Sequence, residues 1–113
     1  LMAAFMDKAA LEAALEHVDL EPESRDAVAR LDDRDLMQID QAILSALGRD
    51  WQKAGFIASG VMISAPDEYE DVPEIVYALR IRALVQASRI GGKGDPDVLK
   101  TYEIRLPATP QVH

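Results

Sequence analysis

The apolar residues of this chain change their spacing once, close to residue 90. Before that point they recur every three or four positions, the spacing that places them on one side of an α-helix. In the segment TYEIRLP, residues 101–107, they alternate with polar residues instead, which is typical of a half-buried strand. The sequence therefore predicts a series of helices followed by a short region of β-structure.

Five helices are predicted before the change. The first lies within residues 5–18, with Leu11, Leu15 and Val18 on its inner side. A short second helix begins at Pro22, since proline fits the first turn, where its missing N–H costs nothing. Three longer helices are predicted over residues 33–48, 51–63 and 72–88.

Particular residues mark the ends of the longer helices. Asp32 or Asp33 can cap the first of them, and Asp50 the second, because a short carboxylate accepts hydrogen bonds from the free N–H groups at a helix start. Gly48 is predicted to stop the first in a left-handed conformation. The inner stripe of that helix is expected to contain Leu36, Ile39, Ile43 and Leu47, widened by Met37 and Leu44.

The C-terminal part predicts a hairpin. RIGGK, residues 89–93, can pair with residues 101–107, because GDPD between them has the composition of a turn. We therefore expect a mainly α fold: a winged-helix-like three-helix core with a C-terminal β-hairpin wing, preceded by two N-terminal helices. Residues 1–113 would form one domain, with a helical extension over 1–31, the core over 32–107 and a tail over 108–113.

The segments WQKAGFIASGVM and ALRIRALVQASRI and the closing YEIRLP resemble a bacterial family catalogued only as a domain of unknown function. The likeness covers about residues 33–107 and depends on the spacing of Trp51, Arg80, Leu84 and the final strand. It implies the winged-helix-like pattern. It implies no activity, because a fold alone does not fix a function.

Composition restricts the setting in which the chain works. The 113 residues are 49% hydrophobic, enough for one modest core, and include no cysteine, which suits a reducing cytoplasm. The longest uncharged segments, such as AGFIASGVMISAP, are shorter than the roughly 18 to 20 residues of a membrane-spanning helix. The first twenty residues lack the basic and apolar regions of a signal peptide, and a start at Leu suggests a fragment or a cloning remnant. A cytoplasmic location without membrane contact is expected.

The net charge of −8 is unevenly distributed. Residues 1–50 carry twelve Asp or Glu against five Lys or Arg, whereas residues 76–113 carry three against six. In a winged helix that reads DNA, the start of the third helix approaches the bases. Here that approach is APDEYEDVPEI, residues 65–75, whose carboxylates would repel phosphates. These acids also have a structural explanation, because negative charge at a helix N-terminus offsets the macrodipole by about 0.3 to 1 kcal/mol per residue.

Two binding functions remain open. The preferred one is a non-catalytic protein-interaction or regulatory module, with Tyr69 as an exposed aromatic contact beside Glu68, Glu70 and Asp71, and with Trp51 and Tyr77 in the core. The partner is not identified by the sequence; a second copy, packed against the alanine-rich first helix, is one expectation. The alternative is a DNA-binding winged-helix transcriptional regulator that contacts phosphates through Arg89, Lys93, Lys100 and Arg105.

Catalysis has less support in the sequence. RIGGKGD lacks the pattern of a phosphate-binding loop and follows a helix instead of preceding one. His17 and His113 are the only histidines and have no metal-ligand spacing, and the serines lack a nucleophile-elbow context. No catalytic residue, metal or cofactor is therefore predicted, and a small enzyme is the third alternative.

Overall fold

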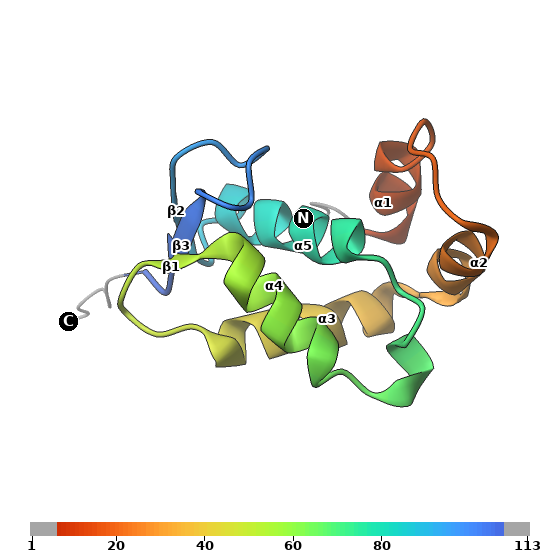
Figure 1. Cartoon of the computed structure of the whole chain (residues 1–113), viewed down its shortest axis with the longest axis horizontal. Coiled ribbons are helices and arrows are strands. Elements are labelled where there is room, and N and C mark those ends of the chain that lie inside the picture. Colours follow the sequence, from red (N-terminus) through yellow and green to blue (C-terminus); the bar gives the residue numbers. More distant parts are fainter. Residues whose placement is uncertain (1–6, 108–113) are drawn as a thin grey trace.

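The computed structural model describes residues 7–107 (Figure 1). Within them the chain is mainly helical, with one small antiparallel sheet. The helices are Lys8–Ala14 (α1), Pro22–Arg30 (α2), Asp33–Ala46 (α3), Ala54–Ile63 (α4) and Glu74–Gln86 (α5), with a short 3₁₀ turn at Asp67–Tyr69 (η1). The strands are Gln52–Lys53 (β1), Gly91–Lys93 (β2) and Glu103–Arg105 (β3). The proposed tail, 108–113, lies outside the described residues.

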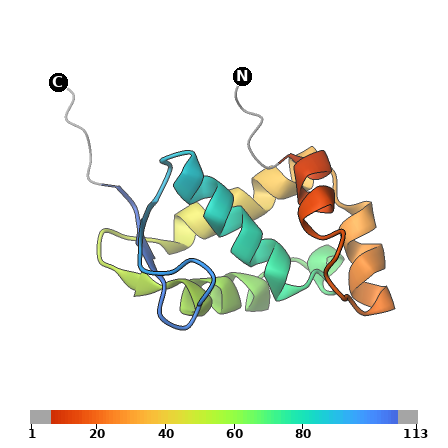
Figure 2. The ribbon, with the colours of Figure 1, turned by 90° about the horizontal axis from the view of Figure 1, so that it is seen from above.

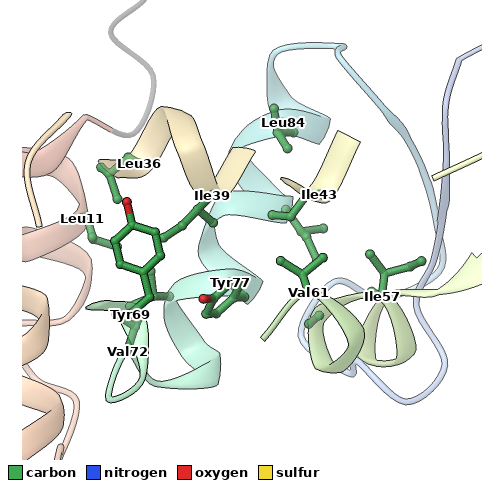
Figure 3. Packing of buried hydrophobic residues seen from close by; sticks show 14 of the residues in the cluster. Leu11, Leu36, Ile39, Ile43, Ile57, Val61, Tyr69, Val72, Tyr77 and Leu84 are labelled. Atoms are coloured by element: carbon green, nitrogen blue, oxygen red, sulfur yellow. The ribbon is translucent and has the colours of Figure 1, made fainter. Parts of the chain in front are cut away.

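Helices α3, α4 and α5 pack on one another to form the core, and α1 and α2 lie together at one end of the molecule (Figures 1 and 2). The predicted stripe of α3 is buried, since Leu36, Ile39, Ile43 and Leu47 all belong to the core. Figure 3 shows side chains of α3, α4 and α5 meeting between the helices. Met37 does not widen this stripe: its side chain is 65% exposed, so that prediction is wrong.

The three strands form a sheet in the order β1-β3-β2, with both pairs antiparallel. The predicted hairpin is confirmed, with Gly92 opposite Ile104, and the side chains of Tyr102 and Ile104 are buried as the alternation indicated. A side chain at Gly92 would collide with the ring of Tyr102, because an added Cβ would lie 2.0 Å from the phenol oxygen. The inner face of the sheet therefore requires glycine there.

Strand β1 was not predicted, because residues 51–63 read as one helix. The backbone of Gln52 and Lys53 pairs instead with Ile104 and Glu103 of β3, so α4 begins only at Ala54. Its N-cap is Lys53, and Asp50 does not cap it. The helical pattern was overridden by a partner strand 50 residues away in the chain, which local periodicity cannot reveal.

Two helix ends also differ from expectation. Gly48 is not left-handed; α3 ends because Leu47 adopts an extended conformation that leads toward β1. Among the described residues other than glycine, the left-handed one is Ser88, with φ 62°, after α5. The N–H of Ser88 donates to the carbonyl of Val85 and that of Arg89 to the carbonyl of Leu84, the two hydrogen bonds of a Schellman motif.

A buried ion pair joins α3 to α5. Arg80 Nε donates to Asp40 Oδ1 at 2.8 Å, and Arg80 Nη2 donates to Asp40 Oδ2 at 2.7 Å. Only 4% of Arg80 and 9% of Asp40 is exposed. Neither the position of Asp40 on the buried stripe of α3 nor its pairing with Arg80 was predicted from the sequence.

The N-terminal helices are attached to the core by apolar and polar contacts. Leu11 and Leu15 are buried, as predicted for the inner side of the first helix, and Ala27 and Val28 of α2 are buried as well. The backbone N–H of Lys8 donates to Asp33 Oδ1 at 2.8 Å, and its ammonium donates to the carbonyls of Ala29 and Leu31. Among the described residues, no helix is long and apolar enough to cross a membrane.

Candidate functional site

The acidic segment before α5 is fixed to the core by Tyr69. Contrary to prediction, this side chain is only 8% exposed: its ring packs beside Leu36 and Val72, as Figure 3 shows. Its hydroxyl donates to Asp35 Oδ1 at 2.8 Å. The expectation of an exposed aromatic was wrong because the flanking acids suggested a solvated loop, whereas one residue of that loop is an anchor.

The acceptor Asp35 belongs to the capping box of α3. Its N–H donates to Asp32 Oδ1, and its own carboxylate accepts from the N–H of Asp32, both at 2.9 Å. The hydrogen bond from the Asp32 backbone and that from Tyr69 both lower the pKa of Asp35. Burial and the neighbouring carboxylate of Asp35 raise the pKa of Tyr69, so it stays a neutral donor.

With Tyr69 as the anchor, the acids around it face solvent. Glu68, Glu70 and Asp71 are exposed, as are Asp67 and Glu74. Together these five residues form what we call the acidic loop, which ends at the first turn of α5. The predicted carboxylates therefore lie at the helix start where the sequence placed them.

A groove begins at that end of α5. It has a volume of about 380 Å³ and lies between the outer side of α5 and the loop joining β2 to β3. Its apolar lining comes from Ile75, Ala78 and Leu79 of the helix and from Pro96 and Leu99 of the loop. Glu74, the member of the acidic loop that belongs to α5, lines it as well.

The loop that forms the second wall is held by several contacts. Arg82 of α5 donates a hydrogen bond to Asp97 and forms an ion pair with it. The N–H of Asp97 donates to Asp95 Oδ1 at 2.9 Å, the local turn that GDPD predicted. The carbonyl of Leu99 accepts from the N–H of Gly55 at 3.2 Å, and an added Cβ on Gly55 would lie 3.3 Å from the same oxygen. Because Gly55 has no side chain, the start of α4 can pack closely against this loop.

The outer face of the sheet carries a second group of side chains. Lys93 Nζ lies 4.7 Å and Arg105 Cζ 4.2 Å from the centre of the Trp51 ring. Lys93 also pairs with Glu103 at 3.3 Å. Trp51 is thus half-buried beneath cations instead of filling the core, which corrects the prediction for it; Tyr77, in contrast, is buried as expected.

The four basic residues that were predicted to contact phosphates in the DNA-binding alternative do not lie together on one surface. Lys93 and Arg105 lie over Trp51, whereas Arg89 is exposed at the corner after α5 and Lys100 is exposed in the loop between β2 and β3. Of the other two basic residues in the C-terminal part, Arg80 is paired with Asp40 and Arg82 with Asp97. Several of the basic side chains that make residues 76–113 net positive are therefore already paired with carboxylates.

Within residues 7–107 no group of three or more His, Cys, Asp or Glu side chains could hold a metal ion. His17 is exposed after the end of α1, and His113 lies outside the described residues. Ser64 donates its hydroxyl to the carbonyl of Gly60 at 2.9 Å, which is a helix-end contact.

The groove was missed at the level of sequence. Ile75 and Leu79 form one apolar track of α5, whereas the track that faces the core contains Val76, Tyr77, Arg80 and Leu84. Two apolar tracks on one helix are the signal that could have indicated a second contact surface.

Comparison of the chain with protein-family models, with curated proteins and with solved structures found no match.

Proposed function

We propose that this chain is a non-catalytic protein-interaction module with a winged-helix-like fold, and that it binds a partner segment in the groove on the outer side of α5. The observation that carries the proposal is an apolar groove whose lining includes Glu74, one of the five residues of the acidic loop. A module of this kind needs no catalytic group, because its work is recognition.

The order of elements supports the winged-helix-like part. Helices α3, α4 and α5 would be its three helices, β1 its short strand after the first, and β2 with β3 its wing. In that arrangement α5 occupies the position of the helix that enters the major groove in DNA-reading relatives of the fold. The proposed resemblance to the bacterial domain family concerns the same residues.

The outer side of α5 is unsuited to a phosphate backbone. The residues of α5 that line the groove are Glu74, three apolar side chains and Arg82, which is already paired with Asp97. Direct base readout requires polar side chains that reach base edges, and phosphate contact requires free cations. An apolar helix side with carboxylates at its tip fits a protein partner better.

Charge complementarity indicates the chemistry of that partner. A segment with one or two large apolar side chains could fill the groove, and basic residues beside them would face the acidic loop. A basic partner would also be attracted to the net charge of −8 over longer distances.

A display selection tests this function. Random short peptides would be selected on the full chain and screened against the variant Leu79→Glu, which places a charge in the groove. We expect enriched peptides to combine Leu, Ile, Phe or Met with neighbouring Lys or Arg, and to lose at least about tenfold in affinity on Leu79→Glu.

The matched control is Met37→Glu, which introduces the same charge at an exposed apolar residue of α3. It should leave the affinity of a selected peptide unchanged. Peptides that bind Leu79→Glu as tightly as the natural chain, or that carry an excess of acidic residues, would refute the groove as the binding site.

DNA binding through the sheet remains the second candidate function, and the cluster of Lys93 and Arg105 over Trp51 favours it. Fluorescence anisotropy with random duplex DNA, titrated with salt, tests it directly. Because the acidic loop repels phosphates, we expect no binding at physiological ionic strength. Micromolar affinity with a steep salt dependence, abolished by Lys93→Glu and retained by Leu79→Glu, would establish the second candidate in place of the first.

A further inference from the structure

Helix α4 has an uncovered apolar side. Ala54, Ile57, Ala58 and Val61 face the core, yet on the opposite side Phe56 is 71% exposed and Ile63 is 85% exposed. The ten residues of this helix include no charged side chain. A helix that is apolar on all sides is normally buried, and exposed large side chains gathered on one surface indicate a contact site.

Gly60 lies between these two side chains. A Cβ added there would have no heavy atom within 4 Å, so packing inside the chain gives no reason for a glycine. Glycine in a helix interior lowers helix stability relative to alanine. Its bare backbone does, however, let another helix approach closely between Phe56 and Ile63.

We propose that the outer side of α4 binds the same side of a second copy of this chain. The two helices would run antiparallel across a two-fold axis at Ser59 and Gly60, which lie midway between Phe56 and Ile63. Phe56 of each chain would then pack beside Ile63 of the other, the reciprocal arrangement that a two-fold interface requires.

Charge supports a second copy as the occupant. Two chains that each carry −8 repel one another wherever acidic surfaces meet, so self-association requires a surface without carboxylates. The outer side of α4 meets this condition. The exposed side of α1, where a second copy was first expected, carries Glu12 and is followed by the exposed Glu16, so it does not.

The contact is small. A helix of ten residues is about 15 Å long and cannot supply the roughly 800 Å² per partner of a standard interface. The dimer should therefore be weak, with a dissociation constant of the order of 100 μM. It uses a different surface from the groove on α5.

Sedimentation equilibrium of the full chain, from about 10 μM to about 1 mM, measures this association. We expect the average mass to rise toward twice that of the monomer. Phe56→Glu and Ile63→Glu should each keep the chain monomeric over the whole range. The control Met37→Glu adds the same charge to an exposed apolar residue elsewhere and should associate like the natural chain.

The variant Gly60→Leu distinguishes a specific contact between two α4 helices from non-specific association of exposed apolar side chains. The larger side chain should raise the melting temperature of the monomer, because leucine favours the helix, and weaken association at least about tenfold, because it blocks close approach. A natural chain that stays monomeric at 1 mM would overturn the proposal. So would loss of association in Met37→Glu, or association unchanged in Gly60→Leu. Peptide binding in the groove should be the same in Phe56→Glu, so the two proposals can fail separately.

Discussion

Asp40 and Arg80 place two opposite charges between α3 and α5, where both side chains are almost completely shielded from solvent. Such a pair adds little to the free energy of unfolding compared with apolar residues of the same shape, but removing one partner takes the opposite charge of the pair away from a buried group. The two parallel hydrogen bonds also fix the angle and register of the helices, because a guanidinium binds a carboxylate in one plane.

We expect Asp40→Ala to lower the free energy of unfolding by about 3 to 5 kcal/mol, and Arg80→Met to do the same. The double variant Asp40→Leu with Arg80→Met should recover most of that loss, since neither charge of the pair is then buried. Urea unfolding followed by circular dichroism measures all three. The exposed pair provides the control, because Arg82→Met should cost less than about 1 kcal/mol. If the single variants lower the free energy of unfolding no more than this control, the buried pair does not have the role in stability that we assign to it.

Asp35 makes the free energy of unfolding depend on pH under acidic conditions. Hydrogen bonds from Asp32 and Tyr69 lower its pKa in the folded state. Its stabilising contribution is therefore complete above the unfolded pKa of about 3.9 and is lost as the pH falls through the lower folded value. We expect Tyr69→Phe to shift the pKa of the Asp35 carboxyl upward, as measured by NMR titration. An unchanged pKa in Tyr69→Phe would show that the phenol does not hold the carboxylate.

At the scale of elements, the end of α5 carries a residue in a conformation that suits glycine better. Ser88 closes the Schellman motif with φ 62°, where a side chain is strained. Glycine adopts that conformation freely, although it also gains freedom in the unfolded chain.

Ser88→Gly should therefore stabilise the protein by about 0.5 to 1 kcal/mol. The same exchange at Ser59, an exposed position within α4, should destabilise it by roughly 0.5 kcal/mol, because glycine is the poorer helix former there. Thermal unfolding of both variants provides the comparison. A loss of stability in Ser88→Gly would contradict the assigned role of this residue.

At the scale of the whole molecule, the elements that follow from local pattern were predicted and those that need a distant partner were not. The buried stripe of α3 and the hairpin of β2 and β3 are visible in the spacing of their residues. Strand β1 is not, because only β3 converts Gln52 and Lys53 from helix to strand. For the same reason Trp51 was expected in the core, although it lies on the sheet under two cations.

The same distinction between local pattern and distant contacts applies to the candidate site. The acidic loop could be predicted because its five carboxylates lie within eight consecutive residues, 67–74. The groove could not, because one wall is α5 and the other is the loop after β2, whose position depends on contacts such as Arg82 with Asp97 and Gly55 with Leu99. Tyr69 lies between these cases: its neighbours indicated exposure, and only Asp35 on α3 explains its burial.

We propose that α5 and the acidic loop form one protein-binding surface. Chemical-shift mapping of the ¹⁵N-labelled full chain with a selected basic and apolar peptide tests this proposal. We expect the largest shifts at Ile75, Ala78 and Leu79, with further shifts at Glu70 and Asp71. Shifts centred on Trp51, Lys93 and Arg105, with α5 unaffected, would contradict it.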